Sequence, residues 1–205
     1  MDSNVDMGAE AVVTYGDYLG RPAVLKTRVR KGYRHPELDQ TLRSQRTKNE
    51  ARTMREARLA GVRTPVIYDV DHRDGIIVME HMFGRKVKDI IDNEPESMEM
   101  VCTKIGEAVA KMHNARICHG DLTTSNMILT DSGELCVFDF SLGSIKCDIE
   151  EMGVDIRLLE RAFSSAHSRS AQAFGIILES YRVNMHRSKE VLNRAEIIKN
   201  RARYT

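Results

Sequence analysis

The sequence predicts an α+β fold with two lobes: an antiparallel sheet with one long helix, followed by a small helical part. Two pairs of β-branched runs surround turn residues within the first 81 residues, and residues 37–60 between the pairs contain no glycine or proline. Apolar residues then recur at helical spacing from residue 87 almost to the end. We therefore expect a first lobe at residues 1–81 and a helical second lobe at residues 82–205, ending in a short basic tail.

The first lobe is expected to begin and end with a hairpin. Residues 9–29 hold two β-branched runs around a turn with glycine and aspartate, and residues 66–81 repeat the pattern around residues 73–75. The helix between them should start at Pro36 and stop near Gly61, because proline suits the first turn of a helix and glycine the position after its end. The predicted order is β-β-α-β-β.

The second lobe is expected to be mainly helical. Residues 87–93 and 97–117 have helical spacing, residues 126–141 read as a short hairpin around residues 131–133, and the chain beyond about residue 151 looks helical again. One apolar stripe of the helix at 97–117 is formed by Met98, Val101, Ile105, Ala108, Val109 and Met112.

Composition indicates a folded protein. The chain of 205 residues is 41% hydrophobic and 30% charged, which is enough to bury a sizeable core. It has no run of 18 apolar residues, and its first ten residues lack the basic start and apolar stretch of a signal peptide, so we expect a soluble intracellular protein that does not bind membranes. Four separated cysteines without a CxxC pair favour reduced thiols over disulfides or structural zinc.

Positive charge is concentrated in one part of the chain. From Arg21 to Arg63 thirteen lysines and arginines stand against four acidic residues, although the whole chain carries a net charge of only +1. Such a stripe can bind nucleic acid or polyphosphate, and a solvated helix face gives the same count, so both interpretations stay open. An aromatic content of 5% without tryptophan argues against a platform on which bases stack.

The stretch "HGDLTTSN", residues 119–126, carries the first catalytic signal. An acid followed five residues later by an amide is the D-x-x-x-x-N pattern in which the acid accepts a hydroxyl proton and the amide holds magnesium. We therefore assign Asp121 as catalytic and Asn126 as a metal ligand. Asp139, in "VFDFSLG" at the end of an apolar strand, is the second expected metal ligand.

Two residues of the first lobe complete the set. Lys26 in "AVLK" lies on the second expected strand, where it can reach nucleotide phosphates, and Glu50 in the long helix can hold it. Each part has a plain alternative: H-G-D can be any turn, Lys26 an exposed lysine, and Glu50 a partner of Arg46 or Arg55 on its own helix. Together they follow the order found in protein kinases, so the chain resembles a protein-kinase-like bilobal fold.

Some kinase features are missing. No G-x-G-x-x-G precedes Lys26, and only "MGAEAVV" offers backbone N–H groups to cover phosphates, through Gly8, Ala9, Glu10 and Ala11. Gly120 takes the place of the arginine in H-R-D, and only fifteen residues separate Asp139 from Asp155, too few for a long activation segment. We expect Asp155 to be the buried helix acid that braces the catalytic loop, the alternative being a first-turn helix acid.

A more specific resemblance is carried by "LKTRVRKGYRHPELDQTLRSQRTKNEARTM", "HGDLTTSNMIL", "FDFSLG" and "VDIRLLERAF". These stretches resemble the small atypical serine/threonine kinase subunit of the KEOPS (EKC) complex, the PRPK family of RIO-like kinases. The resemblance implies a protein that uses ATP with Mg2+ or Mn2+ and binds a glycoprotease-like catalytic subunit and a small regulatory subunit. It further implies ATP hydrolysis that supports threonylcarbamoyladenosine synthesis in tRNA, reached through the complex, and phosphorylation of serine in acidic proteins.

The resemblance also assigns places and roles. Eukaryotic members are associated with the nucleus and telomere maintenance, so we expect a cytoplasmic and nuclear protein. Lys26 would contact phosphates and Glu50 would anchor it, while Glu80 and Met82 lie where the hinge between lobes offers backbone groups to adenine; the alternative there is a strand end. The family usually ends in an "RGRKR"-like tail, whereas this chain ends "KNRARYT".

Two other functions are compatible with the motifs. Small-molecule phosphotransferases of the aminoglycoside or choline kinase type use the same loop, but they normally need a larger helical lobe to enclose their substrate. A non-catalytic scaffold could keep the fold as a docking surface. The intact set of lysine, glutamate, two aspartates and asparagine argues against that second alternative.

Overall fold

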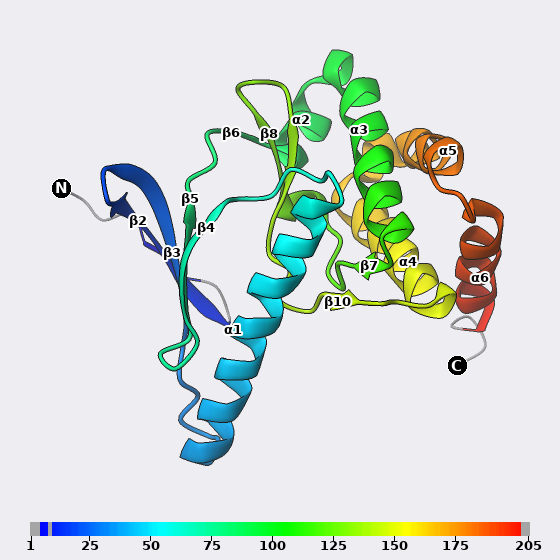
Figure 1. Cartoon of the computed structure of the whole chain (residues 1–205). Helices are drawn as coiled ribbons and strands as arrows, with labels where there is room; N and C mark the ends of the chain where they lie inside the picture. The colour runs from blue at the N-terminus through cyan, green and yellow to red at the C-terminus, as the bar shows by residue number, and fades with distance from the viewer. Residues whose placement is uncertain (1–4, 8–9, 202–205) are drawn as a thin grey trace.

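The computed structural model describes residues 5–7 and 10–201, and it has a sheet-containing part and a helical part, with α1 lying between them in the view of Figure 1. The sheet has five strands in the order β1-β2-β3-β5-β4, and every neighbouring pair is antiparallel. The strands are β1 (Val5–Met7), β2 (Ala11–Tyr18), β3 (Arg21–Arg28), β4 (Ile67–Asp71) and β5 (Ile76–Glu80).

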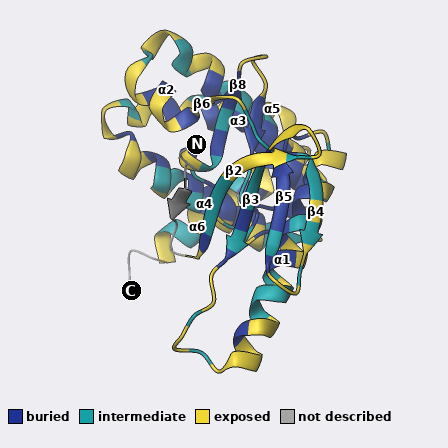
Figure 2. Cartoon of the chain, turned by 90° about the vertical axis from the view of Figure 1, so that its left-hand side faces the viewer, coloured by how far each residue is buried: buried dark blue, intermediate teal, exposed yellow. Residues whose placement is uncertain are grey.

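Turn chemistry explains both predicted hairpins. Between β2 and β3 the two turn residues Leu19 and Gly20 have φ angles of 52° and 79°, the left-handed pair that matches the twist of the flanking strands. Between β4 and β5 the positive φ of 74° falls on Gly75, as its residue type predicts. Figure 2 shows that β3 and β5 are the more buried strands of this sheet.

The long helix α1 (Pro36–Leu59) confirms the predicted helix. Proline occupies its first turn, and Gly61, with a φ of 85°, follows its C-cap Ala60. The start of the helix is exposed, whereas its second half packs on the rest of the protein through buried residues that include Glu50 and Met54.

The second part contains most of the helices. They are α2 (Val87–Asn93), α3 (Pro95–Asn114), α4 (Ile149–Ala166), α5 (Phe174–Asn184) and α6 (Ser188–Arg201), with short 3-10 turns η1 (Thr124–Asn126) and η2 (Ser168–Ala173). Short strands form two small sheets, β6 (Gly84–Lys86) with β8 (Met127–Thr130) and β9 (Leu135–Val137), and β7 (Ile117–Cys118) with β10 (Ser144–Ile145). Among the described residues no helix has the length and apolar character needed to span a membrane.

The end of α3 differs from the prediction. The helix stops at Asn114, three residues before the expected Ile117, because Arg116 turns the chain with a φ of 59°. Ile117 and Cys118 then pair with Ile145 and Ser144, which the local sequence did not indicate. The hairpin predicted at residues 126–141 is confirmed as β8 and β9.

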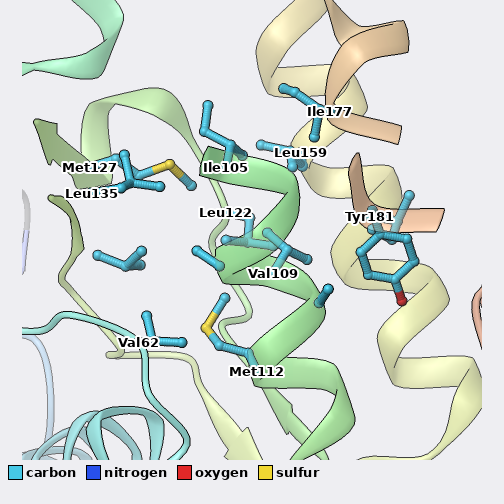
Figure 3. Close-up of a cluster of buried hydrophobic side chains, with 14 of the residues drawn as sticks. Val62, Ile105, Val109, Met112, Leu122, Met127, Leu135, Leu159, Ile177 and Tyr181 are labelled. Carbon is cyan, nitrogen blue, oxygen red and sulfur yellow. The ribbon is translucent and has the colours of Figure 1, made fainter. Parts of the chain in front are cut away.

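α3 lies at the centre of the core. Its predicted apolar stripe is buried except for Met98, which is only partly covered. In the view of Figure 3, Ile105 of α3 lies between Met127 and Leu135 of β8 and β9 on one side and Leu159 and Ile177 of α4 and α5 on the other. Gly106 permits the close approach of α5, since a Cβ there would lie 2.5 Å from the carbonyl oxygen of Ile177. This packing fixes the helix that leads into the catalytic loop.

Candidate active site

The loop between β7 and β8 brings Asp121 and Asn126 together, as the spacing predicts. The Asn126 side-chain Nδ2 donates to the Asp121 backbone oxygen at 3.0 Å and to its carboxylate Oδ2 at 3.1 Å. Both amide hydrogens are therefore used, which leaves Oδ1 as the atom that can bind a metal ion. Asp121 is exposed, so its carboxylate is accessible to a reacting hydroxyl or water.

Asp155 of α4 braces this loop, in agreement with the expectation. Its Oδ2 accepts the His119 N–H at 2.7 Å, and its Oδ1 accepts the Gly120 N–H at 2.8 Å, while the side chain is only 1% exposed. Burial disfavours its charge, but His113 and the backbone N–H of His119 outweigh that effect and hold the pKa of Asp155 below its ordinary value. The carboxylate therefore fixes the backbone immediately before Asp121.

Gly120 stands where the H-R-D arginine is found, and the structure gives the reason. Its φ is 78°, and a Cβ at this position would lie 2.3 Å from the backbone oxygen of Leu142. A larger residue would be strained and would clash. The short segment after Asp139 thus occupies the space that a side chain at position 120 would need.

His119 links the loop to the strand end that carries Asp139. Its Nε2 lies 3.0 Å from the Phe138 carbonyl oxygen, and its Nδ1 lies 3.2 Å from the Asp121 N–H. These contacts require Nε2 to donate and Nδ1 to accept, which defines a neutral tautomer. His119 is fully buried, so the ring acts as a fixed spacer between the two expected active-site acids.

A second brace was not found from the sequence. The buried Thr124 Oγ1 lies 2.8 Å from His167 Nε2, and His167 Nδ1 lies 2.5 Å from Asp92 Oδ1. The three residues resemble a nucleophile-base-acid series, but the Thr124 hydroxyl is buried and its helical turn carries Asn126. The three side chains therefore support the turn that positions Asn126. They come from segments far apart in the sequence, so no local motif indicated the contact.

Lys26 and Glu50 form the predicted pair. Lys26 Nζ lies 2.7 Å from Glu50 Oε1, and it also lies 2.7 Å from Asp139 Oδ1. Burial disfavours the charge of Asp139, but Lys26 and Ser141 outweigh it and hold the pKa of that carboxyl below its usual range. Asp139 adopts a φ of 63°, an uncommon value for a residue other than glycine that often marks functional sites.

Two further residues contact the cluster formed by Lys26, Glu50 and Asp139, and the sequence assigned a role to neither of them. Arg28 Nη2 lies 2.5 Å from Glu50 Oε2, on the same face of β3 as Lys26. Alternation along a strand puts residues two apart on one face, and this signal could have found Arg28. Ser141 stands where protein kinases have the glycine of their D-F-G motif, and its Oγ lies 3.1 Å from Lys26 Nζ and 3.2 Å from Arg28 Nη2.

A cleft of about 310 Å³ is lined by five of the predicted site residues. Apolar and aromatic side chains of β2, β3, β5 and β8 form much of its lining. Lys26, Asn126, Asp139, Glu80 and Met82 all line it, whereas Glu50 and Asp121 do not. The cleft is therefore a pocket with a lysine, a carboxylate and an amide near one another.

The remaining predicted nucleotide-binding residues have other contacts. The Glu80 carboxylate is held by Arg63 Nη2 at 2.6 Å and by the Val66 N–H at 3.0 Å. The Glu80 N–H donates to the Val66 oxygen at 2.8 Å, which leaves the backbone oxygen of Glu80 for a ligand. Glu10 pairs with Arg46 at 2.8 Å, and neither Glu10 nor the buried Ala11 lines the cleft. The prediction for Gly8 and Ala9 concerns positions outside the described residues.

Comparison with known proteins identifies the family. Residues 23–170 match the model of the RIO domain. The chain is 40% identical to the KEOPS complex subunit Bud32 of Pyrococcus abyssi, over 86% of this chain and 84% of that protein. The chain belongs to the Bud32 family of RIO-domain proteins. It is also 35% identical to the EKC/KEOPS complex subunit bud32 of Dictyostelium discoideum, over 97% of this chain and 82% of that protein.

Longer relatives contain this family region as one part. A probable bifunctional tRNA threonylcarbamoyladenosine biosynthesis protein of Methanothermobacter thermautotrophicus is 41% identical over 97% of this chain, which spans only 36% of that relative. Among solved structures, the Rio2 kinase-ADP/Mg2+-phosphoaspartate complex from Chaetomium thermophilum aligns with a TM-score of 0.66, covering 98% of this chain and 71% of that one. Identity to it is 13%, so this likeness shows the fold, a kinase-like α+β fold.

Proposed function

We propose that the chain is an atypical kinase/ATPase subunit of a KEOPS-type complex that supports threonylcarbamoyladenosine formation in tRNA. One observation carries the proposal: Lys26, Asn126 and Asp139 line a single cleft, with Glu50 holding the lysine. The Bud32 relatives, which are named as KEOPS complex subunits and match over most of both chains, support the assignment to the complex. They favour it over a small-molecule phosphotransferase or a non-catalytic scaffold.

The residues of the cleft fit a nucleotide with a divalent metal. Lys26 would contact phosphate oxygens, and the Asn126 Oδ1 with the Asp139 carboxylate would hold the ion, since oxygen ligands suit Mg2+ and also Mn2+. A bound ion neutralises charge on the phosphates. The fold neighbour solved with ADP and Mg2+ supports this use of the cleft. Met82 and the backbone oxygen of Glu80, which line the same cleft, would meet the adenine.

Asp121 would receive the proton of the attacking group. Its carboxylate is exposed, and Asn126 holds it, so it can orient either water or a serine hydroxyl. Hydrolysis and phosphorylation of serine in acidic proteins then differ only in which hydroxyl enters. We propose that the same residues serve both reactions.

The partners proposed are a glycoprotease-like catalytic subunit and a small regulatory subunit, with tRNA reached through the complex. Relatives called bifunctional carry this region within a longer chain, which supports close physical association with a second activity. We propose a cytoplasmic and nuclear location and, for a eukaryotic member, a part in telomere maintenance.

The site is tested with Asp139→Ala. The variant should lower Mg2+-dependent ATP hydrolysis by at least about 100-fold. The reason is that Mg2+ would lose a preorganised carboxylate ligand and would no longer neutralise the charge on the phosphates as well. Asp131→Ala, which removes an exposed acid from the β8–β9 turn, is the matched control and should hydrolyse ATP at the parental rate. Parental hydrolysis by Asp139→Ala would contradict the site assignment.

The complex is tested separately by gel filtration with a purified glycoprotease-like subunit. Co-elution, together with threonylcarbamoyladenosine formation that Asp139→Ala abolishes without disturbing co-elution, is the expected result. Independent elution of the two proteins would contradict the proposed partner while leaving the nucleotide site untouched.

A further inference from the structure

Glu50 is shared by two cations from one strand. Lys26 and Arg28 both project from the same face of β3, Lys26 to Glu50 Oε1 and Arg28 to Glu50 Oε2. The three side chains are buried, with exposures of 9%, 4% and 0% for Lys26, Arg28 and Glu50. A buried carboxylate of this kind is stable only when its oxygens are paired, and Arg28 supplies the second partner.

Glu50 is the closer of two acidic partners of Arg28, since the half-exposed Glu10 lies 3.8 Å from Arg28 Nη1. The Arg28 Nε atom is buried without a hydrogen-bond partner, a penalty that packing of an apolar side chain would avoid. Arg28 also balances the cluster, because Lys26 and Arg28 together match the two carboxylates of Glu50 and Asp139. Without Arg28, Lys26 would be the one cation of this four-residue cluster and would be drawn towards Glu50.

Ser141 joins the two carboxylates to the two cations. Its hydroxyl contacts Asp139 Oδ1, and its Oγ lies 3.3 Å from Glu50 Oε2, 3.1 Å from Lys26 Nζ and 3.2 Å from Arg28 Nη2. A hydroxyl can donate once and accept twice, so it can donate to Asp139 while accepting from both cations. A glycine at this position has no atom that could do so.

We propose that Arg28 and Ser141 are positioning residues of the nucleotide site, an inference that rests on the proposed function. Arg28 holds Glu50, and Ser141 holds Asp139, so that Glu50 stays anchored whether Lys26 contacts Asp139 or a nucleotide phosphate. Neither residue lines the cleft, so each acts through another side chain. Together they set the direction in which Lys26 points.

The nucleotide arm of the test uses a fluorescent ADP analogue with Mg2+. Arg28→Met should weaken its affinity about tenfold and Ser141→Ala about threefold, because small displacements of positioning groups are costly. Arg28→Lys should recover part of the loss. In a Lys26→Met background, Arg28→Met should cause no further loss, since its effect passes through Lys26.

Matched controls separate positioning from general damage. Arg157→Met removes a half-buried arginine that pairs with an acid, Glu160, outside the cluster, and Ser188→Ala removes a buried hydroxyl. Both should bind the analogue as the parent does. Unchanged affinity in Arg28→Met, or an equal loss in the presence and absence of Lys26, would overturn the proposal.

A nucleotide-free arm keeps the outcome separate from the proposed function. The denaturant midpoint should fall in Arg28→Met, and much less when Glu50→Gln is already present, because the two side chains hold each other. Additive shifts would overturn the anchoring of Glu50 by Arg28. Failure of the parent to bind nucleotide would contradict the proposed function, whereas the midpoint cycle would still decide whether Arg28 anchors Glu50.

Discussion

Asp121 differs from the other acids of the site in having no cation within ion-pairing distance among the described residues. Its contacts are with the Asn126 amide, and its carboxylate is exposed. An exposed carboxylate that is not engaged in an ion pair can accept a proton, which is the role proposed for Asp121.

Asp121→Asn is therefore expected to lower turnover by about two to four orders of magnitude, the usual contribution of a general base. Nucleotide affinity should change little, because the amide keeps the volume of the carboxylate and Asp121 does not line the cleft. Steady-state hydrolysis and equilibrium binding of an ADP analogue measure the two quantities. A parallel fall of both would instead indicate damage to the loop.

At the scale of elements, α4 matters because it carries Asp155 into the catalytic loop. Its start is fixed by a capping box: Asp148 Oδ1 accepts the Glu151 N–H at 2.9 Å, and Glu151 Oε2 accepts the Asp148 N–H at 3.0 Å. By fixing the start of α4, the capping box helps to position Asp155, which accepts hydrogen bonds from the N–H groups of residues 119 and 120.

Removal of the cap should loosen this helix. Asp148→Ala is expected to lower the free energy of unfolding by about 1 kcal/mol, whereas Asp148→Asn should cost less because an amide oxygen can also cap. Denaturant titration of the three proteins gives the order. If Asp148→Ala unfolds at the parental midpoint, the capping box does not contribute to stability.

The segment between Asp139 and Asp155 is short and tied down at several points. β10 pairs with β7, the Cys147 N–H donates to the Arg116 oxygen at 2.9 Å, and Asn49 Nδ2 donates to the Gly143 oxygen at 2.7 Å. These contacts order the segment without phosphorylation. Gly120 also has no side chain that could pair with a phosphate group.

ATP hydrolysis should therefore not depend on phosphorylation within residues 140–154. Phosphatase-treated and untreated protein are expected to have rates within about twofold, because no new ion pair is needed to order the segment. Mass spectrometry of both samples confirms the phosphorylation state. Loss of activity on treatment, reversed by rephosphorylation, would refute this expectation.

For the whole molecule, the buried Asp155 and the partly exposed Asp139 predict how stability depends on pH. The pKa of Asp155 and that of Asp139 are both held below their ordinary values, so these groups bind protons less readily in the folded state than in the unfolded state. Their contribution is present above the unfolded pKa, near 4, and is lost as pH falls through the lower folded values.

Thermal midpoints should accordingly fall steeply below about pH 4, where the unfolded chain takes up more protons than the folded one. Asp155→Asn should be less stable at pH 7 and should show a shallower fall between pH 5 and pH 3, about the range in which linkage acts. Asp131→Asn, at an exposed turn, should follow the parent. Parallel curves for Asp155→Asn and the parent would exclude Asp155 as a source of the acid limb.

Local signals in the sequence determined much of the fold. Turn residues located both hairpins, the first by a turn with glycine and aspartate and the second at residues 73–75, and Pro36 with Gly61 located α1, because each depends on backbone preferences of a few neighbouring residues. The spacing of residues 119–126 and the strand before Asp139 likewise placed the expected catalytic loop and metal ligands. The end of α3 escaped this reasoning, since its last residues leave the helix to form a strand with a distant segment.

Only the tertiary structure decided which side chains surround the predicted ones. Arg28 and Ser141 meet Glu50 across 22 and 91 residues of sequence, and His167 reaches Thr124 across 43. It also showed that Glu80 is bound to Arg63 and that Gly120 is required by the closeness of Leu142. The physical reason is that helix ends and turns are set by short-range sterics and hydrogen bonding, whereas contacts between buried charges depend on how complete elements pack.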